Sequence, residues 1–427
     1  MDTIYAPATA PGRAAIAIVR LSGPRSRDAL LEICGTVPPA RLARRVRLRD
    51  LDDGLALFFP APRSLTGEDV AELHVHGGRA VVSGVMAALR GLGLRLAEPG
   101  EFTRRAFLNG KLDLTQAEAV ADLAAAETEA QRRQALRQLD GALGDLYRGW
   151  SDRLLRVLAH LEAAIDFPDE DLPAEIERQV AHETAALGAE IAAHLADAHR
   201  GERLRDGIDI AVVGPPNAGK SSLLNRLARR EAAITSPIPG TTRDVVEVAI
   251  DLAGFPVVLA DTAGLRETGE AIEREGVRRA LARAEKADLR LYVFDAAAPI
   301  AAEGAAAWPG GDTILVANKT DLADSRVPPG AIAVSALTGD GIARLVSAVA
   351  ERISARYDGA APVLTRARHR EALEAAAEAL MRAGNAPLPE LKAEDLRLAW
   401  RSIARITGRA DIEDLLDVIF AEFCLGK

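Results

Sequence analysis

Cysteine and aromatic residues are both scarce in this sequence. Only two cysteines occur among the 427 residues, Cys34 and Cys424, and they lie near opposite ends of the chain. Two such residues supply neither a disulfide framework nor a cysteine cage for a metal ion, so we expect a reducing compartment. Aromatic residues make up 4% of the chain, which leaves Ala, Leu and Val to fill the hydrophobic cores.

Long apolar runs are missing as well. No uncharged stretch is long enough to span a bilayer, and the first residues lack a basic segment followed by an apolar one. We therefore expect a soluble protein of the cytoplasm with no membrane partner. The net charge of -9 provides no overall positive field, so any nucleic acid would have to meet local basic patches.

The length suggests two or three domains, and the residue pattern separates them. Residues 1–118 mix short β-branched runs with Gly and Pro turns, which predicts a small α+β domain. At Thr115 an Ala-, Leu- and Arg-rich helical periodicity begins, with Glu118 completing an expected capping box, and it runs to about Leu161. Two prolines within 166–173 must interrupt it before a second helical stretch.

Residues 208–356 follow a different pattern. Short apolar strands alternate with helices there, which predicts a doubly wound α/β domain of the Ras-like P-loop kind. Helical texture on both sides indicates that this domain is inserted into one all-α domain, made of residues 119–207 and 357–427. The expected strands are 208–213, 245–252, 257–260, 289–294, 314–317 and 332–334.

A phosphate-binding loop follows the first of these strands. Residues 214–221 read Gly-Pro-Pro-Asn-Ala-Gly-Lys-Ser and precede an apolar helix, so main-chain amides can close around phosphates at the helix N-terminus. A plain glycine-rich turn is the alternative, which the placement between strand and helix disfavours. The residues expected to bind the nucleotide here are Asn217, Ala218, Gly219, Lys220, Ser221 and Ser222.

Three further motifs, each after an expected strand, indicate which nucleotide is bound. Asp321 follows Asn318 and Lys319, and its carboxylate can accept both N1–H and N2–H of guanine, a pair of donors that adenine lacks. That favours GTP over ATP. The other expected contacts are Asp261, Thr262, Ala263 and Gly264 near the metal and γ-phosphate, and Ser335, Ala336 and Leu337 near the guanine O6.

With these motifs in place, the sequence resembles the translation-factor-related GTPases and, over essentially the whole chain, the MnmE (TrmE) family of tRNA modification GTPases. The most specific match is the terminal Phe-Cys-Leu-Gly-Lys at 423–427. The other matching segments are 99–102 (Pro-Gly-Glu-Phe), 105–109 (Arg-Ala-Phe-Leu-Asn), 164–169 (Ala-Ile-Asp-Phe-Pro-Asp), 239–244 (Pro-Gly-Thr-Thr-Arg-Asp) and 261–267 (Asp-Thr-Ala-Gly-Leu-Arg-Glu).

The resemblance also implies how GTP is hydrolysed. Leu265 stands where many small GTPases carry a water-orienting glutamine, and its side chain cannot hydrogen-bond water. The family places its water-positioning carboxylate at Glu273, although on physical grounds alone Glu267, Glu270 and Glu275 compete with it. It also implies Mg²⁺ held by Ser221 and Thr242. In place of an arginine finger it implies K⁺, held when two G domains pair by Asn217, Ser236, Ile238 and Thr241.

For the rest of the chain the resemblance implies dimerisation and a one-carbon donor, 5-formyltetrahydrofolate or a related folate. The candidate folate residues are Arg20, Glu72, Lys111 and Lys427. The first three could equally be ordinary surface ion-pair partners, and Glu72 shares one face of an expected strand with His74 and His76, which leaves a metal site open. The match to the terminal motif assigns Cys424 a catalytic or substrate-contacting role.

Our leading hypothesis is a homodimeric GTPase that works on tRNA in a heterotetramer with a flavin-containing protein of the MnmG type. It would add an aminomethyl or carboxymethylaminomethyl group to C5 of the wobble uridine. No flavin fingerprint is present in this chain, so the redox cofactor should belong to the partner. The alternatives are a regulatory or ribosome-assembly GTPase switch and a stand-alone folate-dependent transferase. A helical stripe suited to RNA phosphates, or simply a solvated face, is formed by Arg397, Arg401, Arg405 and Arg409.

Overall fold

The computed structural model divides into two compact units, which we describe separately. Unit 1 comprises residues 1–124, 136–190 and 372–427, and unit 2 comprises residues 125–135 and 191–371. The residues that the structure describes are 2–166, 174–197, 199–230, 247–261, 284–298, 312–357, 359, 361–410, 413–421, 423, 424 and 426.

A six-stranded sheet in the order β3-β4-β5-β2-β1-β6 begins unit 1. Alternate residues of its strands, such as Val19, Leu21 and Leu73, are buried in one core with Leu30 of α1 and Leu89 of α2, so the two helices pack on that face. The bounds are β1 Ile4–Pro7, β2 Ala14–Ser22, α1 Ser26–Cys34, β3 Arg44–Leu48, β4 Asp52–Phe59, β5 Val70–Gly77, α2 Arg79–Gly91 and β6 Arg95–Leu96.

The helical run predicted from residue 115 begins one residue earlier, and its cap is different. The main-chain N–H of Gln116 donates to Asp113 Oδ1 (2.9 Å), and that of Asp113 donates to Gln116 Oε1 (3.0 Å), which forms a reciprocal capping box. The capping box expected from Thr115 and Glu118 is therefore wrong. Thr115 instead donates its hydroxyl to Asp113 Oδ1, and Glu118 is buried.

This run is also three helices rather than one. Thr128 and Gln131 cap a new start through bonds between their side chains and main-chain amides, and Gly141 takes a left-handed φ of 99° before the third helix. The three helices are α4 Leu114–Ala125, α5 Glu129–Leu139 and α6 Ala142–Asp166; α3, Glu101–Leu108, precedes them.

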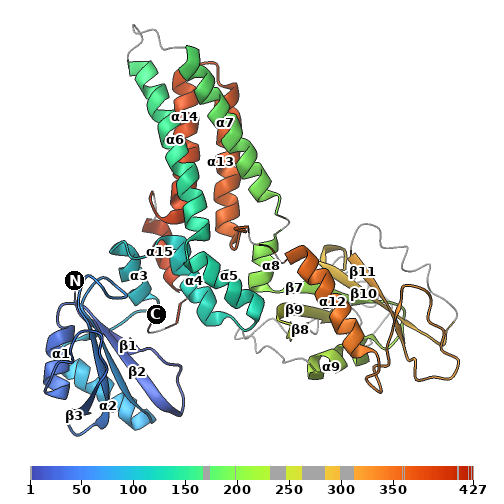
Figure 1. The fold of residues 1–427 in the computed structure, drawn as a ribbon, viewed down its shortest axis with the longest axis horizontal. Helices are drawn as coiled ribbons and strands as arrows, with labels where there is room; N and C mark the ends of the chain where they lie inside the picture. The colour runs from blue at the N-terminus through green and yellow to red at the C-terminus, as the bar shows by residue number, and fades with distance from the viewer. Residues whose placement is uncertain are drawn as a thin grey trace, which may run out of the picture. The chain divides into compact units, whose positions relative to one another are not determined.

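Long helices run side by side in the helical part of the chain (Figure 1). The indole of Trp150 on α6 donates to Glu190 on α7 (2.9 Å), and Arg382 on α13 pairs with Asp395 on α14 (2.9 Å). The break predicted between α6 and α7 falls on residues outside those described. The remaining bounds are α7 Ala174–Leu195, α13 Ala367–Asn385, α14 Pro389–Thr407 and α15 Glu413–Ala421.

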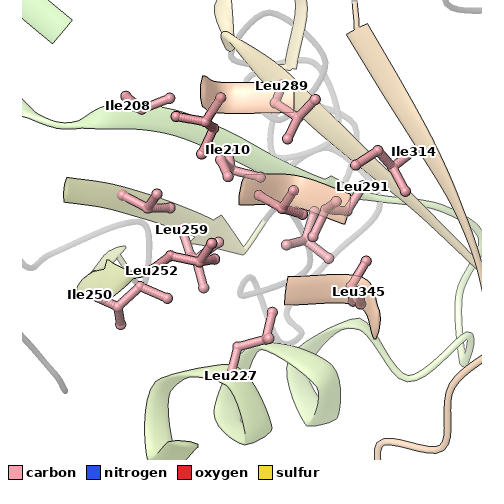
Figure 2. Packing of buried hydrophobic residues seen from close by; sticks show 14 of the residues in the cluster. Ile208, Ile210, Leu227, Ile250, Leu252, Leu259, Leu289, Leu291, Ile314 and Leu345 are labelled. Atoms are coloured by element: carbon pink, nitrogen blue, oxygen red, sulfur yellow. The ribbon is translucent and has the colours of Figure 1, made fainter. Parts of the chain in front are cut away.

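A second six-stranded sheet, in the order β12-β11-β10-β7-β9-β8, is the frame of unit 2. All its neighbouring strands are parallel except β8, which pairs antiparallel with β9 at the edge. Figure 2 shows Ile210, Leu259 and Leu291 from three strands packed together near Leu227 of α9 and Leu345 of α12. The bounds are α8 Arg200–Asp206, β7 Ile208–Val213, α9 Lys220–Arg230, β8 Glu247–Leu252, β9 Phe255–Asp261, β10 Leu289–Asp295, β11 Asp312–Asn318, β12 Ile332–Ala333 and α12 Ile342–Tyr357.

The predicted fold class is thereby confirmed: an α+β part, a discontinuous helical part and an inserted α/β part occur in the predicted order. Across the described stretches of chain, none of the helices has the length and apolarity that crossing a membrane requires.

Candidate functional site

The loop between β7 and α9 depends on its glycines for shape. Gly214 has a φ of 141°, and a Cβ there would lie 2.0 Å from the carbonyl oxygen of Val293. Gly219 has a φ of 87°, and a Cβ there would lie 2.3 Å from Asn318 Nδ2. Asn217 also takes a left-handed φ of 61°, which asparagine tolerates better than most residues. The loop therefore turns back tightly on the ends of the neighbouring strands.

Lys220 is the first residue of α9, and its cation lies at the centre of this loop. Only 8% of the residue is exposed, and Nζ donates to the carbonyl oxygens of Gly214 and Pro215, both at 2.9 Å. Ser221 and Ser222 follow in the first turn, where main-chain N–H groups of a helix have no internal partner. A fixed cation beside such amides suits an anion such as a phosphate group.

Asn318, at the end of β11, connects this loop with the loop that follows β12. The residue is 1% exposed. Its Nδ2 donates to the carbonyl oxygen of Ala218 (2.8 Å), and its Oδ1 accepts from the main-chain N–H of Ala336 (3.0 Å). One buried side chain thus holds two loops whose sequence positions are far apart.

The neighbouring polar groups are similarly fixed. Ser335 donates its hydroxyl to Asp321 Oδ1 (2.6 Å) and accepts from the N–H of Thr338 (3.1 Å). Lys319 has a φ of 64°, and its Nζ bonds Asp295 Oδ2 (2.7 Å). This hydrogen bond from Lys319 lowers the pKa of the Asp295 carboxyl. The Asp321 carboxylate and the Lys319 ammonium are therefore each held by a neighbouring side chain.

These groups surround a cavity of about 590 Å³. The structure brings together at its wall the following residues expected from the sequence: Gly219, Ser222, Asn318, Lys319, Asp321, Ala336 and Leu337. A single recess thus connects the phosphate-type loop with the carboxylate expected to recognise guanine. Its size is in the range of small-molecule sites.

Sequence reasoning missed four other residues that line this cavity: Asn225, Arg226, Arg229 and Leu322. The first three share one face of α9 with Ser222, so helical spacing after the phosphate loop was the signal that could have found them. It also missed Asp295, the partner of Lys319. Asp295 ends a strand and pairs in register with Asn318, so its place at a strand end was the available signal.

Asp261 ends β9, directly beside the phosphate loop's own strand in the sheet. The expected site residues that lie outside the described part of the chain are Ser236, Ile238, Thr241, Thr242, Thr262, Ala263, Gly264, Glu273 and Lys427.

Unit 1 brings two of the four expected folate residues together. Arg20 on β2 and Glu72 on β5 are opposite in register, and Arg20 Nε lies 3.0 Å from Glu72 Oε1. Arg20 Nη1 also donates to the carbonyl oxygen of Gly426 (3.4 Å), which places the C-terminal tail beside this pair. Cys424 is exposed and carries a free thiol. Lys111, by contrast, donates to the carbonyl oxygen of Pro62 (3.1 Å).

The outer face of β5 does not assemble a metal site. Glu72 Oε2 lies 3.2 Å from His74 Nε2, but His76 turns to Asp52, with Nδ1 and Oδ1 at 2.8 Å. Within the described part of the chain, no group of three His, Cys, Asp or Glu residues is arranged to hold a metal ion. The polar residues of this face form hydrogen-bonded pairs instead.

The segment at 99–109, which carried part of the resemblance, forms a buried ion network. Arg105 is 5% exposed and contacts Asp2 (2.7 Å), Glu68 (3.1 Å) and Glu101 (3.0 Å). Burial opposes its charge, while Glu101 and the other two carboxylates raise the pKa of Arg105 above its ordinary value. Arg105 therefore joins α3 to Asp2, just before β1, and to Glu68, in the loop before β5.

The arginine stripe on and after α14 is only partly available. Arg397 lies 2.9 Å from Glu162 and 3.1 Å from Glu394, and Arg409 lies 3.0 Å from Asp152. Arg401 and Arg405 are exposed and form no ion pair with any described residue. Two of the four cations thus remain directed at solvent.

Comparisons with known proteins agree with these features. A family model described as the MnmE helical domain matches residues 114–424, and one described as the N-terminus of the GTP-binding protein TrmE matches residues 3–111. Relatives named tRNA modification GTPase MnmE are 58% identical in Rhodospirillum rubrum, 59% in Parvibaculum lavamentivorans and 51% in Caulobacter vibrioides, each covering all of both chains. The chain therefore belongs to the MnmE family of tRNA modification GTPases.

Proposed function

We propose that the cavity of unit 2 binds GTP and that its hydrolysis drives modification of the wobble uridine of tRNA, in the cytoplasm. The observation that carries this proposal is the meeting of Gly219 of the phosphate loop, Asn318, Asp321 and Ala336 around one recess. Lys220 and the first-turn amides of α9 bind the phosphates. The domain division that goes with this function is 1–118 for folate and dimerisation, 208–356 for GTP, and 119–207 with 357–427 for the helical domain.

The guanine end of the cavity explains why the nucleotide is GTP. Asp321, held by Ser335, accepts the N1–H and N2–H donors of guanine, and the Ala336 N–H, which also donates to Asn318 Oδ1, is shared with O6. Adenine presents an acceptor at N1, which would face the carboxylate and be repelled. A site built for such donors rejects a base that lacks them.

Mg²⁺ and K⁺ are the two ions proposed to take part in hydrolysis. Ser221 lies in the first turn of α9 next to Lys220, and oxygen donors of this type suit Mg²⁺, which would neutralise charge on the phosphates when bound. Asn217 is exposed on the left-handed turn of the loop, so its side-chain oxygen is available to K⁺. The family pattern adds Thr242 for Mg²⁺, Ser236, Ile238 and Thr241 for K⁺, and Glu273 to position the attacking water through a second water.

Exposed apolar residues on the N-terminal sheet support a homodimer. Ile16 is 58% exposed and Leu55 is 41% exposed, and in register they lie opposite His76 and His74, on the face turned away from α1 and α2. Exposed apolar residues on a regular sheet face favour burial against another copy of the same face. We propose that two chains associate through it.

The folate donor is proposed to bind beside Arg20 and Glu72. A guanidinium suits the glutamate carboxylates of a folate, and a carboxylate suits the amine donors of its pterin. The carbonyl contact from Gly426 to Arg20 brings the tail with Cys424 to the same place, and Lys427 and Lys111 would add cations. The one-carbon unit, joined with amine and flavin chemistry supplied by the MnmG-type partner in a heterotetramer, would give the aminomethyl or carboxymethylaminomethyl group.

Removal of residues 424–427 tests this assignment against that of a GTPase switch. The truncated chain should lose wobble-uridine modification in cells, measured by mass analysis of tRNA nucleosides, while its GTP turnover stays nearly unchanged because the cavity belongs to unit 2. A control replaces Arg382, which pairs with Asp395 between α13 and α14, by alanine. Modification that survives the truncation would refute the role of the tail.

A further inference from the structure

Arg226 lies on α9 and reaches the loop after β12, more than a hundred residues along the chain. Its Nε donates to the carbonyl oxygen of Ala336 (3.0 Å), and its Nη2 donates to the carbonyl oxygen of Leu337. A planar guanidinium that binds two successive carbonyls fixes the direction of the main chain as well as its position.

Beyond Ser335, which is buried, and Ala336, which packs against the core of unit 2, the loop that Arg226 holds has little packing. The side chain of Leu337 is 79% exposed, so burial does not anchor it. Inside the loop, the N–H of Ser335 donates to Asp340 (2.9 Å) and that of Gly339 to Ser335 (2.8 Å). These bonds shape the turn but do not attach it to α9. The two bonds from Arg226 make that attachment.

Ala336 is held from both sides. Its carbonyl accepts from Arg226, and its N–H donates to Asn318 Oδ1 (3.0 Å) at the cavity wall, so a guanine O6 bound there would share this donor. Because α9 begins at Lys220, the helix that carries the phosphate-binding lysine also carries the residue that places this amide. The distance between the phosphate end and the base end of the cavity is thereby fixed by one rigid element.

We propose that Arg226 is a positioning residue for guanine recognition: it holds the Ala336 amide where the base O6 is bound. This rests on the proposed assignment of that amide to O6. Arg226 acts on the nucleotide through the loop backbone, so its effect is confined to the contact that the loop makes.

The test measures binding of three nucleotides to the full-length protein with Mg²⁺ by calorimetry. GDP offers all contacts, 6-thio-GDP replaces O6 with a weakly accepting sulfur, and IDP keeps O6 but lacks the amino group that meets Asp321. Arg226→Ala should raise the Kd for GDP and for IDP about tenfold, and that for 6-thio-GDP no more than about twofold. The selectivity for oxygen over sulfur falls, while the selectivity for the amino group stays.

Arg344→Ala is the control, because Arg344 is an exposed arginine on α12 that is not among the residues lining the cavity. This variant should leave the Kd values for all three nucleotides unchanged. Arg226→Gln, which cannot reach both carbonyls, should repeat the loss, and thermal unfolding checks that each variant folds.

Equal rises in Kd for GDP and 6-thio-GDP would mean that Arg226 merely supports the fold, and unchanged values would mean that its bonds contribute nothing to binding. Either result overturns this inference but leaves the proposed function standing. Should the wild type itself bind GDP and 6-thio-GDP equally, the assignment of the Ala336 amide to O6 would fail as well.

Discussion

Asn318→Asp is the substitution that most directly probes how the two loops of the nucleotide cavity are joined. It keeps the oxygen that accepts from the Ala336 N–H but replaces the donor that meets the Ala218 carbonyl at 2.8 Å. Two oxygens then face each other at a site that is 1% exposed, and a charge is buried without a partner. Loss of the bond and burial of the mismatch cost about 2 to 4 kcal/mol.

If this free energy destabilises the conformation that binds the nucleotide, the Kd for GDP should rise by about 30-fold to about 700-fold. Calorimetry with the full-length protein and Mg²⁺ measures it. Asn225→Asp is the control, since Asn225 lines the same cavity but is exposed, and it should change the Kd by less than about threefold. An Asn318→Asp protein that binds GDP within about twofold of the wild type would refute the role given to Asn318.

Two further predictions concern unit 1. Burial raises the pKa of the Cys34 thiol to about 11, so at pH 8 only about one thousandth of it is thiolate. A disulfide reagent should therefore label one thiol in each native chain and none in the Cys424→Ser variant. Rapid labelling of two thiols in each native chain would contradict this prediction. Arg105→Met should lower the free energy of unfolding by about 3 to 5 kcal/mol, because Glu68, whose side chain is 13% exposed, loses its ion-pair partner, whereas Glu101 keeps Arg95. Urea denaturation measures this, and a loss below about 1 kcal/mol would show that the network does not stabilise the fold.

The parts of the fold that the sequence predicted are those decided locally. The apolar run at 208–213 and the glycine-rich loop after it specify a strand and a phosphate loop without help from distant residues, and the structure has both. The cap of α4 was missed because two overlapping patterns fit the same stretch. Asp113 with Gln116 formed the box, where Thr115 with Glu118 was expected.

The contacts that sequence reasoning could not find join residues distant in the chain. Arg20 meets Glu72 only because β2 and β5 pair in that register, and it meets Gly426 only because the tail returns to the sheet. Arg226 reaches Ala336 because α9 lies beside the end of the second sheet. Such pairings depend on tertiary packing, which local patterns do not encode.

The central claim is that Lys220, Asn318 and Asp321 belong to one pocket for a guanine nucleotide. Calorimetry of the wild type and of Asp321→Asn with GDP and XDP, in the presence of Mg²⁺, tests it most directly. The wild type should bind GDP and reject XDP, and the variant should reverse this preference, because an amide can donate to the xanthine oxygen that replaces the guanine amino group. A wild-type protein that binds no GDP, or a variant that still prefers GDP to XDP, would contradict the claim.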